Sequence, residues 1–105
     1  MKPGFVFENS GMYLVCLAFF SLGKRNVGLF QRVSDGMYIT ARDTSKEADG
    51  SYSWAWGHYF KERIEAERDY RMRLDEMCQY TAPGETPEVP QDPCQHWRGI
   101  LRFRP

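Results

Sequence analysis

Aromatic residues with polar tips gather in one short stretch of the chain. Tyr52, Trp54, Trp56, His58 and Tyr59 follow one another closely. Such rings could stack on a nucleobase, a sugar or a partner's arginine, and tryptophan and tyrosine are enriched at binding hot spots. Large rings also supply most of a small core, so packing between a helix and a sheet is the favoured interpretation. We keep Tyr52, Trp54, Trp56 and His58 as candidate binding residues.

A charged ladder follows at helical spacing. Arg63, Glu67 and Arg71 recur at i, i+4 and i+8, so they line one side of a predicted helix. Two guanidinium groups held by one carboxylate could bind a phosphate or a partner's acidic side chain. A structural role is the favoured interpretation, because arginine stems often cover the edge of a core and surface ion pairs contribute little. All three residues are candidate binding residues.

Groups suited to catalysis or metal binding are few. The chain has two histidines, His58 and His96, and the sequence places no activating base beside a nucleophile. His58 with Glu62 and Glu65 has a possible one-turn spacing for a metal, but no second ligand pair completes that site. We predict no enzyme activity, no metal and no cofactor.

Composition indicates a single domain without a strong electrostatic field. The chain has 105 residues, of which 42% are hydrophobic and 15% aromatic, and its formal net charge is zero. That apolar content is sufficient for one core. Zero net charge argues against direct nucleic-acid binding and is compatible with a homodimer. Residues 12–20 form the longest apolar run, which is too short to cross a membrane.

The three cysteines are an odd number with wide spacing. Cys16, Cys78 and Cys94 cannot form a closed disulfide framework, so we expect reduced thiols and a cytoplasmic location. Glu8, which precedes the apolar run, does not fit a secretory signal, so we expect an uncleaved chain. Cys94 and His96 could approach Cys78, but a paired Cys-x-x-Cys ligand set is missing.

The segments that must position these residues begin with predicted strands. Residues 5–7, 13–20, 27–33 and 37–42 are rich in aromatic and β-branched side chains. Residues 13–20 show no polar alternation, so both faces should be covered, and this segment is our candidate central strand. Residues 43–51 are polar and predict an exposed, mobile loop. The alternation at residues 52–56 suits a short strand or an extended entry into a helix.

Asp35-Gly36 favours a two-residue hairpin loop between the last two of these strands. That loop would pair Phe30 with Ala41 and Arg32 with Ile39. The apolar side chains on one side of this hairpin would be Phe30, Met37, Ile39 and Ala41. We expect that side to meet the helix.

Residues 58–80 have the period of an amphipathic helix. Its apolar side would hold Tyr59, Phe60, Ala66, Tyr70, Leu74, Met77 and Cys78. Its far side would hold the acidic residues Glu62, Glu65, Asp69 and Glu76. Such a face is usually solvated, although it could bind a basic partner or mimic a nucleic acid.

The predicted fold class is α+β, with a three- to four-stranded, mainly antiparallel sheet packed by one long amphipathic helix. Residues 1–80 would form the core domain. Residues 81–94 hold four of the six prolines and predict an extended arm. Residues 95–105 predict a short terminal strand that returns to the core.

These patterns favour a noncatalytic macromolecule-binding protein, either an adaptor or a small inhibitor acting on a larger protein or protein–nucleic-acid complex. The compact layout resembles small proteins of phages and mobile elements, a likeness that involves no defined motif. The alternative is a small enzyme or small-molecule-binding protein. It would use a pocket between the sheet and the aromatic stretch, with Arg63 or Arg71 holding an anion and His58 or His96 as the acid–base group.

Overall fold

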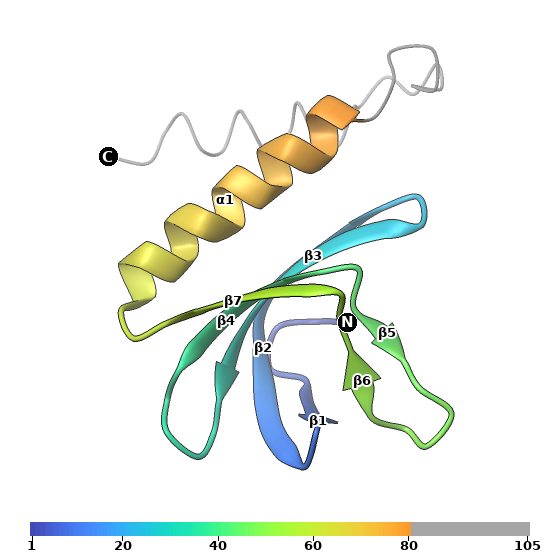
Figure 1. The fold of residues 1–105 in the computed structure, drawn as a ribbon, viewed down its shortest axis with the longest axis vertical. Helices are drawn as coiled ribbons and strands as arrows, with labels where there is room; N and C mark the ends of the chain where they lie inside the picture. The colour runs from blue at the N-terminus through green and yellow to red at the C-terminus, as the bar shows by residue number, and fades with distance from the viewer. Residues whose placement is uncertain (81–105) are drawn as a thin grey trace.

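A five-stranded antiparallel sheet crossed by one helix forms the part of the chain that the computed structural model describes, residues 1–80 (Figure 1). In spatial order the strands are β1 (Val6–Asn9), β2 (Met12–Leu22), β3 (Arg25–Arg32), β4 (Tyr38–Arg42) and β7 (Trp56–Phe60). The helix is α1 (Arg63–Tyr80), and β5 (Ser45–Lys46) pairs with β6 (Tyr52–Ser53) in a separate small hairpin. The α+β class, the antiparallel sheet and the single long helix are therefore confirmed.

The sheet differs from the predicted layout in its number of strands and in its central strand. The sheet has five strands rather than three or four, because β7, part of which was predicted to begin the helix, pairs with β4. The middle position belongs to β3, so the prediction that residues 13–20 form the central strand was wrong. The predicted arm (81–94) and terminal strand (95–105) lie outside the described residues. No helix within residues 1–80 is long and apolar enough to cross a membrane.

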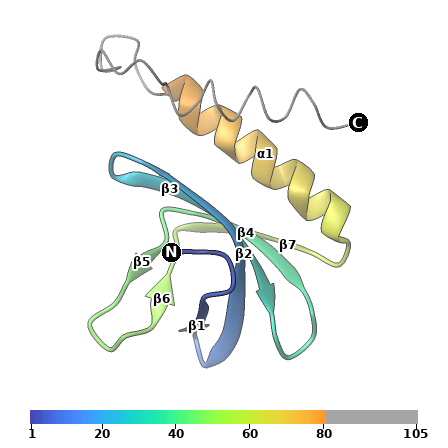
Figure 2. The same ribbon diagram turned by 180° about the vertical axis from the view of Figure 1, so that it is seen from behind.

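The sheet separates two apolar clusters. On the side that we call the helix face, Val27 and Leu29 of β3 pack with buried residues of α1. The α1 residues in this cluster are Ala66, Tyr70, Leu74 and Met77. On the other side, which we call the hairpin face, the buried cluster consists of Phe7, Leu14, Cys16, Phe30, Ile39 and Ala41. Figure 2 shows α1 and the β5–β6 hairpin on opposite sides of the sheet.

The helix therefore lies on the side opposite to the one predicted. Phe30, Ile39 and Ala41 share a face, as expected, but that face does not meet α1. Tyr52 and Trp54 from the segment after β4 pack against it instead. The prediction failed because alternation reports which side chains lie together and does not report which element covers them.

A β-bulge explains why residues 13–20 show no polar alternation. Cys16 pairs with Phe30 and Ala18 pairs with Leu29, so Leu17 is an extra residue in β2. An extra residue exchanges the faces of all the side chains that follow it. Cys16 accordingly packs into the hairpin-face cluster, whereas Ala18 packs into the helix-face cluster. Apolar side chains are thus needed on both faces of this strand.

The β3–β4 hairpin has a longer loop than Asp35-Gly36 alone. Phe30 pairs with Ile39 rather than Ala41, and the Arg32 N–H donates to the Met37 carbonyl at 2.8 Å. The Asp35 carboxylate accepts from the Met37 N–H at 3.1 Å, and it also binds the Arg32 guanidinium. This aspartate-centred turn replaces the two-residue turn, so the predicted register was wrong by two residues.

The segment predicted as an exposed loop, residues 43–51, contains part of a small hairpin. β5 and β6 pair through Ser45 with Ser53 and Lys46 with Tyr52. The Asn9 side-chain amide donates to the Tyr52 carbonyl at 2.7 Å, which joins this hairpin to β1. The hairpin thereby brings Tyr52 onto the hairpin face of the main sheet.

The helix begins at Arg63, five residues later than predicted. His58, Tyr59 and Phe60 belong to β7 and pair with β4, so their side chains alternate instead of following the helical line. Tyr59 is consequently 51% exposed. The apolar line from Ala66 onward is buried as predicted.

The close approach of Phe30 to Gly28 gives a test of the packing on the hairpin face. A Cβ at Gly28 would lie 2.3 Å from Cζ of Phe30, and that ring is fully buried. We predict that Gly28→Ala lowers the free energy of unfolding by about 1–3 kcal/mol, measured by denaturant unfolding. Ser21→Ala, at an exposed position of β2, should change it by less than about 0.5 kcal/mol. Equal stability of both variants would contradict this packing.

Candidate functional site

A polar network joins α1 to the last two strands of the sheet. One oxygen of Asp69, Oδ2, accepts hydrogen bonds from the Thr40 hydroxyl and from Arg73 Nε, the latter at 3.0 Å. His58 Nδ1 lies 3.0 Å from the same oxygen. Arg73 Nη1 donates to the Trp56 carbonyl at 3.2 Å. The helix is therefore fixed to β4 and β7 by directed bonds as well as by apolar packing.

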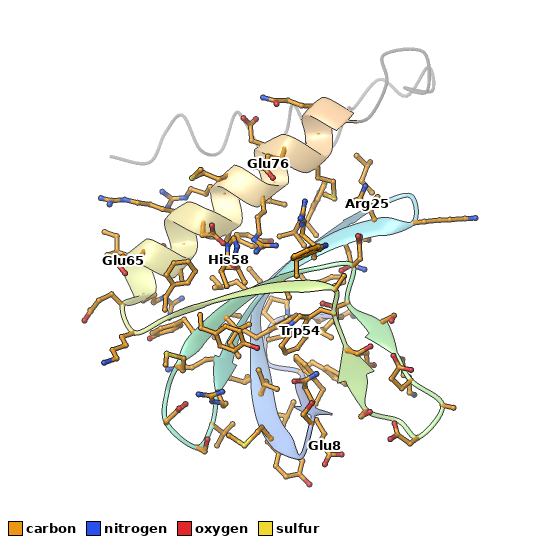
Figure 3. The ribbon with its side chains drawn as sticks, in the orientation of Figure 1. Glu8, Arg25, Trp54, His58, Glu65 and Glu76 are labelled. Atoms are coloured by element: carbon orange, nitrogen blue, oxygen red, sulfur yellow. The ribbon has the colours of Figure 1, made fainter. Side chains whose placement is uncertain are left out.

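The network is largely withdrawn from water on its inner side. Thr40 is fully buried and Arg73 is 4% exposed, whereas the His58 side chain is 58% exposed. Figure 3 shows His58 between the helix and the strands. Burial by itself raises the pKa of Asp69, but the hydrogen bonds from Thr40, His58 and Arg73 outweigh it and hold that pKa below its ordinary value. The carboxylate is thus ionised beside a buried guanidinium.

The predicted acidic far side of the helix is wrong at Asp69. Asp69 faces the sheet, with a side chain only 18% exposed. The Glu76 side chain is 51% exposed, as predicted, although its Oε2 lies 4.0 Å from Arg42 Nη1 of the sheet. The reason is that α1 lies across β3 and β4, so one flank of the helix meets polar side chains of the strands. Glu62 and Glu65 remain exposed.

Sequence reasoning missed Arg73. It lies between the buried residues Tyr70 and Leu74 on the apolar side of the helix, where a charged residue is rarely buried without a partner. Its spacing of four from Asp69 was the one available indication of a pair.

The aromatic stretch divides into a partly buried part and an exposed part. Tyr52 and Trp54 pack on the hairpin face, with ring centroids 5.2 Å from Phe7 and 5.8 Å from Phe30 respectively. They therefore pack against the core and are partly buried, although on the side opposite to the helix. Trp56 on β7 is 65% exposed. Only Trp56 and His58 of the four candidate residues present much surface to a partner.

The charged ladder is present on α1. Arg63 Nε donates to Glu67 Oε1 at 2.9 Å, and Arg71 Nη2 lies 3.7 Å from Glu67 Oε2. Glu67 is two positions from Asp69, so the ladder lies on the flank of the helix away from β7. The structure does not gather the candidate residues into one site. It gives two surfaces, which we call the β7 surface (Trp56 and His58) and the ladder (Arg63, Glu67 and Arg71).

The cysteines have different environments. Cys16 is a buried free thiol, and burial raises its pKa, which keeps it protonated and unreactive. Cys78 is disulfide-bonded, contrary to the expected reduced thiol. Within residues 1–80 no three His, Cys, Asp or Glu residues lie close enough to hold a metal. Cys94 and His96 lie outside the described part.

Removing the charge of Asp69 tests the network. We predict that Asp69→Asn lowers the free energy of unfolding by about 3 kcal/mol, because it leaves the buried guanidinium of Arg73 without a counter-ion. The matched control is Glu65→Gln on the exposed side of the same helix, with an expected change below about 0.5 kcal/mol. Denaturant unfolding measures both. A similar loss in the two variants would show that the network carries no special stability.

Acid should weaken the fold partly through Asp69. Its native pKa lies below its unfolded value, so its contribution is complete above about pH 4 and is lost as the pH falls through the native pKa. The unfolding free energy of Asp69→Asn should therefore fall less steeply below pH 4 than that of the wild type. The hydrogen bond from Arg32 lowers the pKa of Asp35 to about 2. Asp35 should therefore contribute to the pH dependence of unfolding in both the wild type and Asp69→Asn. Parallel pH profiles would contradict this assignment.

Comparison of the chain with protein-family models, with curated proteins and with solved structures finds no match.

Proposed function

We propose that the chain is a noncatalytic binding protein, an adaptor or small inhibitor that acts on a larger protein or protein–nucleic-acid complex. The main support is Trp56, whose side chain is 65% exposed. Its backbone is held on one side by pairing with Arg42 of β4, and its carbonyl accepts a bond from the buried Arg73. A large exposed ring on a fixed backbone loses little conformational freedom on binding, as is typical of interface hot spots.

The position of β7 adds to this support. β7 is the last strand of the described sheet, so one of its edges faces away from β4. Exposed edge strands are common sites of association with other chains. Tyr59 of the same strand is 51% exposed on the opposite face. A partner that reached around this edge would meet both rings.

The ladder provides a second surface for a charged partner. Glu67 is bonded on both sides, while the side chains of Arg63 and Arg71 are 57% and 34% exposed. A guanidinium already held by a carboxylate is partly ordered before it meets an acidic group. The ladder therefore suits a partner that carries an acidic patch next to its apolar contact surface. A homodimer would instead depend on the exposed rings of Trp56 and Tyr59 alone.

The proposal is tested by affinity capture from a lysate of the native source, with Trp56→Ala compared with the wild type. We expect the variant to lose a stoichiometric protein partner, because truncation of a hot-spot tryptophan typically costs about 2 kcal/mol or more of binding. Tyr13→Ala is the matched control, since Tyr13 is 60% exposed on β2. Equal capture by both variants would overturn the role of Trp56.

The ladder has its own test in the same experiment. Arg63→Ala and Arg71→Ala should leave the unfolding free energy within about 0.5 kcal/mol of the wild type, but they should weaken capture. Unchanged capture would remove the ladder from the binding surface. Native mass measurement of the purified chain reports a homodimer independently of any other partner.

A small enzyme or small-molecule-binding protein is the second candidate. The 3.0 Å contact between His58 Nδ1 and Asp69 favours it, because a carboxylate that orients an imidazole is a common feature of general bases. A thermal-shift screen with phosphate-free metabolites tests this candidate. This second candidate requires a compound that raises the melting temperature of the wild type and not that of His58→Ala. The absence of any such rise would exclude a binding site for the compounds tested.

The cytoplasmic location stays a prediction. The disulfide at Cys78 argues for a location outside the cytoplasm, because disulfides are rare in the cytoplasm. Alkylation of the protein from its native source, before and after reduction, distinguishes them. We expect Cys78 to be labelled only after reduction. Labelling before reduction would support the cytoplasmic location.

A further inference from the structure

One edge of the sheet is open to pairing with another strand. β7 is the last strand of the main sheet, and no strand of residues 1–80 lies beyond it. At the opposite edge, β1 is joined to the small hairpin by the bond from Asn9 to the Tyr52 carbonyl. We propose that β7 pairs antiparallel with β7 of a second copy of this chain, about a twofold axis at His58. The resulting homodimer would have one sheet that continues across both copies.

The pairing inside the sheet shows which backbone groups face the open edge. Along an antiparallel strand, the N–H and C=O groups of successive residues point alternately to its two sides. The Asp43 N–H donates to the Asn26 carbonyl next to β3. By this alternation, the residues of β4 that turn their backbone groups toward β7 are Tyr38, Thr40 and Arg42. Their partners in β7 are Phe60, His58 and Trp56. The backbone groups of Gly57 and Tyr59 therefore face the open edge.

These two residues match each other across a twofold axis. When two β7 strands meet antiparallel with His58 opposite His58, Gly57 of each copy lies opposite Tyr59 of the other. Both members of each pair then point their backbone groups at one another, so each pair exchanges both of its N–H···O bonds. A register shifted by one residue would place these groups opposite residues that already pair with β4. The open edge is thus complementary to itself, as a twofold dimer requires.

The side chains suit the same register. Tyr59, which is 51% exposed, would lie opposite Gly57, and an aromatic ring across the strand stabilises an edge glycine. Trp54 lies against Gly57, with Nε1 2.6 Å from the position of a Cβ, so the second copy's Tyr59 would meet this ring. On the other face, the exposed Trp56 would pair with Phe60 of the second copy. Cross-strand aromatic pairs of this kind are favourable.

β7 also lacks the features that protect edge strands from association. Such strands usually carry charged residues, proline or a bulge. β7 has the sequence WGHYF, without lysine, arginine, an acidic residue or proline, and its register with β4 is regular. The formal net charge of the chain is zero, so net charge does not keep two copies apart.

The helix does not close this edge. The strand residues buried beneath α1 are Val27 and Leu29 of β3, whereas the His58 side chain of β7 stays 58% exposed. At the twofold axis the two His58 rings would face each other, each held by its own Asp69 at 3.0 Å. One short strand from each copy makes a small interface, so we expect a weak dimer whose population rises with protein concentration.

This inference goes beyond the proposed function, because the dimer needs no larger partner. Dimerisation is measured on the purified chain and capture is measured in a lysate, so either proposal can fail while the other holds.

The test is sedimentation equilibrium of the purified full chain from micromolar to millimolar concentration, with backbone amide hydrogen exchange followed over the same range. We expect the mass to rise toward that of two chains. The Gly57 and Tyr59 amides should then exchange about tenfold more slowly or less, because they become hydrogen-bonded. Tyr59→Pro should stay monomeric, since it removes an N–H that faces the open edge and not one bonded to β4. Tyr59→Phe is the matched control and should still dimerise.

Each result decides the proposal. A wild-type chain that keeps the mass of one copy at millimolar concentration would overturn it. A dimer whose Gly57 and Tyr59 amides exchange as fast as in the dilute chain would also overturn it, because the copies would then meet through another surface. If Tyr59→Pro fails to fold, the concentration dependence of amide exchange in the wild type decides alone.

Discussion

The ion pair between Asp69 and Arg73 is the interaction on which the arrangement of this protein depends. A buried guanidinium requires a carboxylate nearby, and Asp69 meets that requirement while it also accepts a bond from Thr40 of the sheet. Apolar packing is not directional, so it brings the helix to the sheet without fixing where the helix lies along it. The polar bonds fix that position. They also hold the backbone of Trp56, so the same pair that docks the helix positions the exposed ring.

Periodicity alone predicted much of the fold. The apolar line Ala66, Tyr70, Leu74 and Met77 is buried as expected, and Phe30, Ile39 and Ala41 share one face. Local sequence did not reveal the bulge at Leu17, because an extra residue exchanges faces without changing composition. It also placed the helix on the wrong side of the sheet, since the element that covers a face is determined by contacts between distant segments. The start of the helix was misplaced because Tyr59 and Phe60 fit the apolar line while pairing with β4.

The candidate surfaces were predicted only in part. The ladder followed from spacing along one helix, and Arg63, Glu67 and Arg71 are indeed neighbours. Whether Tyr52 and Trp54 pack on the core depends on tertiary contacts, and in the structure both rings are partly buried on the hairpin face. The bonds from Asp69 to Thr40 and from Arg73 to the Trp56 carbonyl could not be found in the sequence, because these residues come from three separate elements. These contacts form only when the helix packs on the sheet.

A double-mutant cycle between Asp69 and Arg73 tests the central claim most directly. Unfolding free energies would be measured for Asp69→Asn, Arg73→Met and the double variant. Because each single change leaves the other partner's interactions incomplete, we predict a coupling energy of about 2 kcal/mol. Additive effects, with a coupling energy near zero, would show that Asp69 and Arg73 do not act as a unit and would contradict the account.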